Sequence, residues 1–170
     1  MFFAWLIAGT PTARAQYSEY EVKAGLLGNF VQFVKWPAKA FPDPGSPFTI
    51  CIVGSDPFGG YLERAVGGQT MNGHKVTIKH SRRPDDLKSS QVVFVSKSER
   101  SRAGEILGGL QGANVLSVGE TEDFARQGGV INFTMEGDKV RFEINTGAAQ
   151  RAGLELSSKL LRLGKPIAVN

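Results

Sequence analysis

Residues 130–145 read VINFTMEGDKVRFEIN, and apolar and polar residues alternate along both halves of this segment. Such alternation has the two-residue period of a β-strand with one buried face. If only Gly137 and Asp138 form the loop, Phe133 lies opposite Phe142, and the apolar side chains of both strands fall on one face. Glycine at the first loop position suits a type II′ turn. The segment therefore predicts a tight antiparallel hairpin.

The second face of this hairpin is unusually polar. In the same register Asn132 lies opposite Glu143, Thr134 lies opposite Arg141, and Asn145 stands at the exit of the second strand. A polar strand face is available to water, to a ligand or to a partner protein. We therefore expect recognition or chemistry to use this face.

The composition indicates one globular domain. The chain has 170 residues, of which 41% are hydrophobic and 21% charged, which excludes a disordered chain and a multispanning membrane protein. The net charge is +4, yet the twenty Lys and Arg residues are scattered, and only Arg82 and Arg83 are adjacent. Because there is no basic helix and no platform of interleaved aromatic and basic residues, we expect no nucleic-acid partner.

Helical patterns precede and separate the predicted strands. Ser18 and Glu21 have the spacing of a capping box, which predicts a helix that begins there and ends at Trp36, before Pro37. Shorter helices are predicted after Asp56, after Ser98 or Ser101, at residues 121–126 and at residues 148–152.

Three continuous apolar runs, at residues 48–53, 92–95 and 115–118, predict buried strands. Val76 and Ile78, flanked by Lys75 and Lys79, indicate a strand at the sheet edge. Strands that alternate with helices are typical of a parallel sheet with right-handed crossovers. The predicted fold class is α/β: a single Rossmann-like domain with a mostly parallel open sheet, flanked by helices and completed by a C-terminal antiparallel hairpin.

The first fifteen residues have features of an export signal. Residues 2–8 form an apolar run that is too short to span a membrane, and Ala13-Arg14-Ala15 has the small-x-small form of a signal-peptidase site. We expect residues 1–15 to be a signal peptide and residues 16–170 to be a periplasmic domain without stable membrane insertion. The usual basic region before the apolar run is missing, so an apolar N-terminus without a targeting role is the alternative.

Few residues have the pattern of a catalytic or metal site. His74 and His80 lie in polar, turn-rich sequence, and the single cysteine, Cys51, lies within an apolar strand where it is expected to be a buried hydrophobic residue. No spacing of His, Cys and carboxylates resembles a zinc site. We therefore expect no enzyme activity, no metal and no cofactor.

The residues that remain for a binding site lie at the end of the hairpin. Arg151 follows Asn145 by about one and a half helical turns, so Glu143, Asn145 and Arg151 can converge at the strand exit. In the alternative interpretation Asn145 caps the following helix, and Glu143 forms a solvated ion pair with Arg141 or Lys139.

Several short motifs together resemble the YfiR family of bacterial periplasmic proteins. They are Val22-Lys23-Ala24, Asn29-Phe30-Val31, Lys35-Trp36-Pro37, Ile50-Cys51-Ile52-Val53-Gly54, Gly129-Val130-Ile131-Asn132-Phe133, Val140-Arg141-Phe142-Glu143-Ile144-Asn145 and Leu160-Leu161-Arg162-Leu163. The resemblance implies a small α/β domain, often dimeric, that represses an inner-membrane diguanylate cyclase from the periplasm and so lowers cyclic-di-GMP signalling and biofilm formation. It implies no catalytic role. A small-molecule-binding sensor that acts in another signalling system is the alternative.

The same resemblance implies a polar pocket for a ligand or partner. In this sequence its residues are Lys35, Glu143, Asn145, Arg151 and Ser157. A lysine and a glutamate beside an aromatic residue can hold a zwitterionic or aromatic ligand, or a charged side chain of a partner. The alternative is that these residues form a salt bridge between helix and sheet.

This sequence departs from some YfiR relatives at Cys51. Several relatives carry disulfides, one of which uses the cysteine of this strand, but the partner strand at residues 91–95 contains no cysteine here. We therefore expect no control through an internal disulfide.

Overall fold

The computed structural model describes the backbone of residues 12–169 and the side chains of residues 19–169. Most of the predicted signal peptide, including residues 2–8, lies outside the described residues, so the export signal and the cleavage near Gln16 stay predictions. The first helix, α1 (Thr12–Phe33), begins six residues before Ser18. Ser18 is therefore not its first residue, because residues 12–17 contain no helix breaker and the helix extends back through them.

Helix α1 also ends earlier than predicted, at Phe33. The next two residues form β1 (Val34–Lys35), which pairs antiparallel with β9 (Glu155–Leu156) in a separate two-stranded ribbon. The backbone groups of Val34 and Lys35 therefore bond to a segment near the end of the chain.

Eight strands form one sheet in the order β10-β8-β7-β6-β5-β2-β4-β3. Strands β4, β2, β5, β6 and β7 are parallel, whereas β8 is antiparallel to β7. This confirms the predicted α/β class with a mostly parallel sheet and an antiparallel hairpin. The strands are β2 (Phe48–Val53), β3 (Thr70–Met71), β4 (His74–His80), β5 (Val92–Val95), β6 (Leu116–Gly119), β7 (Ile131–Glu136), β8 (Lys139–Asn145) and β10 (Lys165–Ile167).

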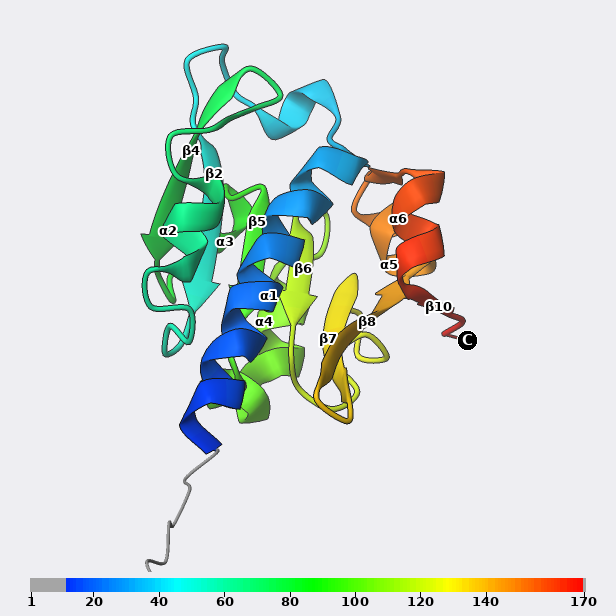
Figure 1. The fold of residues 1–170 in the computed structure, drawn as a ribbon. Helices are drawn as coiled ribbons and strands as arrows, with labels where there is room; N and C mark the ends of the chain where they lie inside the picture. Colours follow the sequence, from blue (N-terminus) through cyan, green and yellow to red (C-terminus); the bar gives the residue numbers. More distant parts are fainter. Residues whose placement is uncertain (1–11, 170) are drawn as a thin grey trace, which may run out of the picture.

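Helices cover both faces of the sheet (Figure 1). Helices α1 and α2 pack with the core on one face, and α3 and α4 pack with the core on the other. The remaining helices are α2 (Tyr61–Val66), α3 (Pro84–Lys88), α4 (Ala103–Gly109), α5 (Thr146–Arg151) and α6 (Ser158–Leu163), with the 3-10 helices η1 (Ala38–Ala40) and η2 (Lys97–Arg102).

The structure contradicts two of the predicted helices. Asp56 does not cap a helix: it accepts a hydrogen bond from the Phe58 backbone N–H in a turn, and α2 begins only at Tyr61. Residues 121–126 form turns instead of a helix. Asp123 has φ 61°, and a left-handed residue of this kind interrupts a helix.

The hairpin has the predicted register, with Phe133 opposite Phe142, Asn132 opposite Glu143 and Glu136 opposite Lys139. Its apolar face packs on α1, where the ring of Phe30 lies 5.7 Å from Phe133 and 4.8 Å from Phe142. The polar face of the hairpin therefore points away from α1.

The loop at residues 120–129 is fixed against the sheet by Phe124. The Phe124 ring occupies the space beside Gly119 and Gly129, and a Cβ atom at either glycine would overlap the ring. Asn145 adds a second anchor, because its Nδ2 donates to the Ala125 carbonyl oxygen at 2.7 Å. These contacts place the loop beside α5, where it forms one wall of a cavity.

Candidate functional site

The usual ligand crevice of an open α/β sheet is filled by the protein itself. Such sheets bind ligands outside the carboxyl ends of the strands, where the strand order reverses, which here is between β2 and β5. A Cβ atom at Gly54 would overlap Ser98 Oγ, and the buried Glu99 carboxylate pairs with Arg82 at 2.9 Å and Arg102 at 3.2 Å. The candidate site therefore lies elsewhere.

Two of the predicted site residues belong to the β1–β9 ribbon or follow it directly. Lys35 is exposed and pairs with Glu155, with 3.7 Å between Nζ and Oε2. Ser157 caps α6, since its Oγ accepts a hydrogen bond from the Leu160 backbone N–H at 3.2 Å. Lys35 is therefore paired across the ribbon and not with Glu143.

Asn145 caps α5, as the structural alternative predicted. Its Oδ1 accepts from the Ala148 backbone N–H at 2.9 Å, while its Nδ2 donates to Ala125. The residue is buried, and both ends of its amide already have partners. Asn145 therefore shapes the surroundings of the site by joining β8, α5 and the loop at residues 120–129.

Glu143 stands half-buried at the centre of the polar hairpin face. It lies opposite Asn132 on β7 and opposite Lys165 on β10. Within the described residues its carboxylate has no ion pair within 4 Å, and Arg141 pairs instead with Glu136 at 3.2 Å. In the alternative interpretation Glu143 pairs with Arg141 or Lys139, and neither pair forms. Its carboxylate is therefore available to a ligand or partner.

Asn132, opposite Glu143, has an unusual environment for an amide. Its residue exposure is 3%, and its Oδ1 is buried without a hydrogen-bond partner among the described residues. Leaving a buried acceptor unpaired costs about 1–3 kcal/mol. Because this oxygen is buried, only the Glu143 carboxylate of the pair is presented on the polar face.

A cavity of about 500 Å³ separates α4 from α5. Ala148 lines it from α5 and Ala152 from the residue after that helix. Leu107 lines it from α4, Leu110 from the residue after α4, and Val115 lies just before β6. This volume lies within the range of small-molecule sites. At its floor, Ser117 Oγ accepts a hydrogen bond from the Val130 backbone N–H at 2.9 Å.

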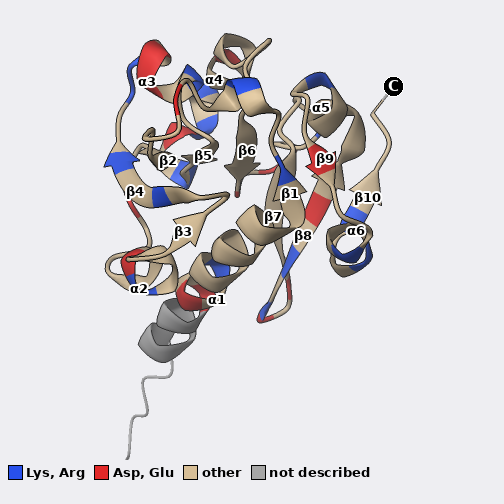
Figure 2. Cartoon of the chain, turned by 90° about the horizontal axis from the view of Figure 1, so that it is seen from above, with Lys and Arg blue, Asp and Glu red and all other residues tan. Residues whose placement is uncertain are grey.

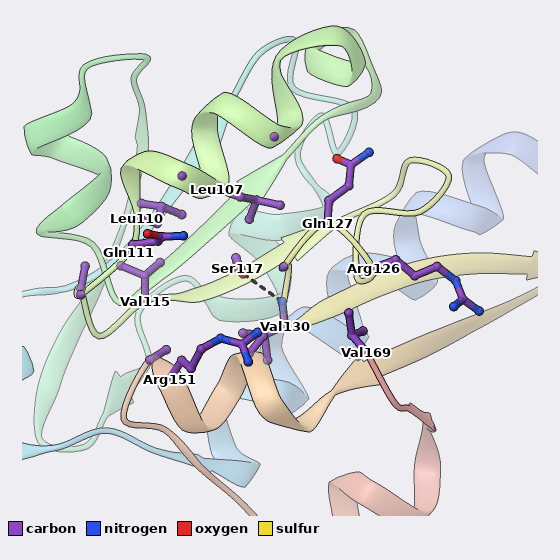
Figure 3. A pocket seen from close by; sticks show the side chains of 17 residues that line it. Leu107, Leu110, Gln111, Val115, Ser117, Arg126, Gln127, Val130, Arg151 and Val169 are labelled. Atoms are coloured by element: carbon purple, nitrogen blue, oxygen red, sulfur yellow. Dashed lines mark hydrogen bonds between the residues drawn. The ribbon is translucent and has the colours of Figure 1, made fainter.

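Two arginines give the cavity its charge. Arg151 extends from α5 toward Val130, and Arg126 stands with Gln127 on the loop across the cavity (Figure 3). Arg126 pairs only with the exposed Asp123, at 3.7 Å, and Arg151 has no ion pair within 4 Å among the described residues. Guanidinium groups bind carboxylates and phosphates, so the cavity suits an anionic group.

Sequence reasoning placed Arg151 at a site but missed Arg126, Gln127 and Gln111. These three residues come from two separate loops, whose meeting depends on how Phe124 docks on the sheet. The sequence around them has neither helical nor strand periodicity that would predict where these loops lie. Only the adjacent glycines at positions 128 and 129, which permit a close approach of the loop, point to the region.

The nucleophilic and basic side chains are dispersed. His74 stacks on Phe41, and His80 bonds to Asp56 at 2.7 Å, on a different edge of the sheet from the cavity. Cys51 is buried, and burial raises the pKa of its thiol. Among the described residues no group of three or more His, Cys, Asp or Glu side chains could hold a metal ion. The histidines and the cysteine therefore do not converge on the cavity.

Within residues 12–169, none of the helices combines the length and the apolar character needed to cross a membrane.

Comparison with known proteins places these features in context. A family model described as YfiR/HmsC-like matches residues 20–165. The fold is similar to a conserved domain protein of Vibrio cholerae O1 biovar El Tor, with 12% identity, a TM-score of 0.58, and coverage of 86% of this chain and 59% of that one.

It is also similar to an ABC domain of Streptococcus pneumonia solved in complex with L-Trp, with 13% identity, a TM-score of 0.52, and coverage of 83% and 60%. The chain thus spans less than two thirds of either structure, and at these identities the likeness concerns the fold alone.

Proposed function

Because the chain belongs to the YfiR/HmsC-like family, which covers residues 20–165, we propose that it binds and represses the periplasmic part of an inner-membrane diguanylate cyclase. The family is one of non-enzymatic regulators of cyclic-di-GMP signalling. Repression of the cyclase lowers cyclic-di-GMP and with it biofilm formation. The single observation that carries this proposal is the family match over nearly the whole domain.

Charged side chains that have no ion pair among the described residues support a binding role. Among the described residues Glu143 and Arg151 have no ion pair within 4 Å, so both charges are available to a partner. A partner protein can pair with such half-exposed charges at the rim of an interface, where they set specificity and association rate.

A gene deletion tests the proposal in the cell. Deleting the gene should raise cyclic-di-GMP and biofilm, and expressing the full chain should restore both. The matched control is the same chain without residues 1–15, which should stay in the cytoplasm and fail to restore them. An unchanged cyclic-di-GMP level in the deletion strain contradicts repression, provided that a diguanylate cyclase encoded beside the gene is expressed. Rescue by the shortened chain contradicts action in the periplasm.

Purified proteins test direct binding. Residues 16–170 should bind the periplasmic portion of a cyclase encoded beside the gene, as measured by isothermal titration calorimetry. Light scattering of the same preparation tests the homodimer that the family resemblance implies. Absence of binding at 100 μM of each protein, with both folded by circular dichroism, would rule out this direct partner.

The cavity between α4 and α5 favours a second function, that of a periplasmic small-molecule sensor. Its volume of about 500 Å³ and its two arginines suit a small molecule with an anionic group. The Glu143 carboxylate, which has no ion pair among the described residues, offers a second polar position on the hairpin. A sensor and a repressor are compatible, since a ligand can alter the affinity for a partner.

A thermal-shift screen with carboxylate and phosphate metabolites tests the sensor function. A ligand at 100 times its dissociation constant adds about 2.7 kcal/mol to the free energy of unfolding. Arg151→Gln should abolish the shift, whereas Arg162→Gln, on the exposed surface of α6, should leave it unchanged. Equal loss of the shift in both variants would place the ligand outside the cavity.

A further inference from the structure

Strand β4 forms an open edge of the sheet over most of its length (Figure 1). On its inner side β4 pairs with β2 from Val76 to His80, but on its outer side β3 reaches only His74 and Lys75. The last ladder bond on the outer side runs from the Val76 N–H to the Gln69 carbonyl oxygen at 3.1 Å. Beyond this point no described strand lies beside β4.

The direction of the main-chain groups follows from these bonds. The Ser81 N–H bonds inward to the Ile52 carbonyl oxygen at 3.3 Å, whereas the Val76 N–H bonds outward. Because successive residues of a strand alternate in direction, Ile78 and His80 direct their N–H and C=O groups outward. These groups have no hydrogen-bond partner within the described residues.

A cavity of about 300 Å³ lies directly beside these groups, between β4 and α2. Glu63, Val66 and the following Gly67 line it from the end of α2, and Val76, Ile78 and His80 line it from β4. Val76 and Ile78 are alternate residues, so their side chains share the face that α2 covers. The groove between α2 and β4 thus combines open main-chain groups with a largely apolar hollow.

The opposite face of β4 is cationic. Lys75 and Lys79 alternate with the groove residues and are exposed, and Arg82 and Arg83 follow the strand (Figure 2). Lys79 pairs with Asp86 at 3.2 Å, but Lys75 and Arg83 have no ion pair within 4 Å among the described residues. The lysines point away from the groove and do not cover it.

We propose that the β4 edge binds an extended segment of a partner protein as an added strand, with alternating apolar and acidic residues. Its main chain bonds to Ile78 and His80, and its apolar side chains enter the groove beside Val66. Its acidic side chains lie next to Lys79 and within diagonal reach of Lys75, whose own edge β3 already covers. The apolar–charged alternation of the bound segment matches that of β4, because residues that pair across strands share a face. This surface is on the opposite half of the sheet from the cavity between α4 and α5.

The test uses a fluorescein-labelled peptide of seven residues in which glutamate alternates with valine, and it measures anisotropy with residues 16–170. The peptide should bind, and a matched peptide with lysine in place of glutamate should bind at least tenfold more weakly. An added strand turns only one set of its amides toward β4. Methylating the nitrogens of one alternate set should therefore abolish binding, while methylating the other set should preserve it.

Variants of the protein complete the test. Ile78→Pro removes the outward N–H and leaves the inner ladder intact, since proline is tolerated on edge strands. It should abolish binding, with some loss of thermal stability because the half-buried Ile78 side chain packs on the core. If it fails to fold, the double variant Lys75→Glu and Arg83→Glu should weaken binding at least tenfold, whereas Lys139→Glu, at the far hairpin, should not.

Three results would overturn the proposal. The first is that methylating either set of peptide amides weakens peptide binding equally. The second is that the peptide still binds after the charge reversal at Lys75 and Arg83. The third is a concentration-dependent dimer that Ile78→Pro dissociates, since it would assign the edge to a second copy of this chain.

Discussion

Lys23 on α1 and Glu120, directly after β6, form an ion pair of 2.8 Å in which both side chains are almost completely buried. Lys23 also bonds to Glu19, and its ammonium group lies 4.6 Å from the centre of the Tyr20 ring. Removing one partner of a buried pair leaves an uncompensated charge, which typically costs 3–5 kcal/mol. The pair therefore fixes α1 on the carboxyl edge of the sheet.

Lys23→Met should lower the free energy of unfolding by about 3 kcal/mol, because it leaves Glu120 buried without its cation. Urea denaturation of residues 16–170 measures this loss. The double variant Lys23→Met with Glu120→Leu should recover most of it, and the exposed Lys39→Met should change little. A loss below about 1 kcal/mol in Lys23→Met would contradict the role of the pair.

Tyr20 should make the free energy of unfolding fall at alkaline pH. Burial and the nearby carboxylates of Glu120 and Glu19 raise the pKa of its phenol above the usual value of about 10. The unfolded chain then releases the phenol proton first as the pH rises. Stability from this group is therefore present below about pH 10 and is lost above it.

Tyr20→Phe should remove this part of the decline. Urea midpoints between pH 8 and pH 11 measure it, with wild type and variant compared at each pH. Parallel curves for the two proteins over the whole range would contradict the assignment to Tyr20.

Cys51 should be unreactive in the folded protein. It lies at the centre of β2, and burial raises the pKa of its thiol, so it stays protonated at pH 8, where a free cysteine is partly ionised. Ellman's reagent should label it only after denaturation, which serves as the control because Cys51 is the sole cysteine. Cys51→Ala should cost about 1 kcal/mol. Rapid labelling of the native protein would place the thiol at the surface.

Glu143→Ala should abolish ligand response or repression while it changes the free energy of unfolding by less than about 1 kcal/mol. The small effect on stability is expected because the half-buried carboxylate makes no ion pair among the described residues. Cyclic-di-GMP levels in a complemented deletion strain measure the function, and Glu136→Ala, on the exposed hairpin tip, is the matched control. If the variant unfolds, or regulates normally, Glu143 has only a structural role.

The hairpin could be predicted from sequence because its two determinants are local. Strand alternation and a two-residue loop fix the register of Phe133 and Phe142 regardless of the rest of the chain. The end of α1 could not be predicted in the same way, because Val34 and Lys35 leave the helix to pair with β9, about 120 positions further along. Helical periodicity contains no information about such a partner.

The site was only partly predictable for the same reason. Arg151 follows Asn145 within one short helix, and so its position beside the hairpin exit could be inferred. Arg126 and Gln127 reach the cavity because residues 121–128 form turns that are anchored by Phe124. The sequence instead suggested a helix there, and a helix would have placed these side chains differently.

The packing of Phe30 against Phe133 and Phe142 also has a consequence for the order in which the protein folds. The hairpin forms from neighbouring residues, whereas α1 meets it only across about a hundred residues of intervening chain. Contacts between distant segments form slowly, because the chain must first lose the entropy of closing a large loop. During synthesis the part of α1 that packs on α2 gains its partner early, whereas the part that carries Phe30 is complete long before the hairpin exists. The nascent chain therefore leaves this part of its first helix accessible to chaperones until the hairpin arrives.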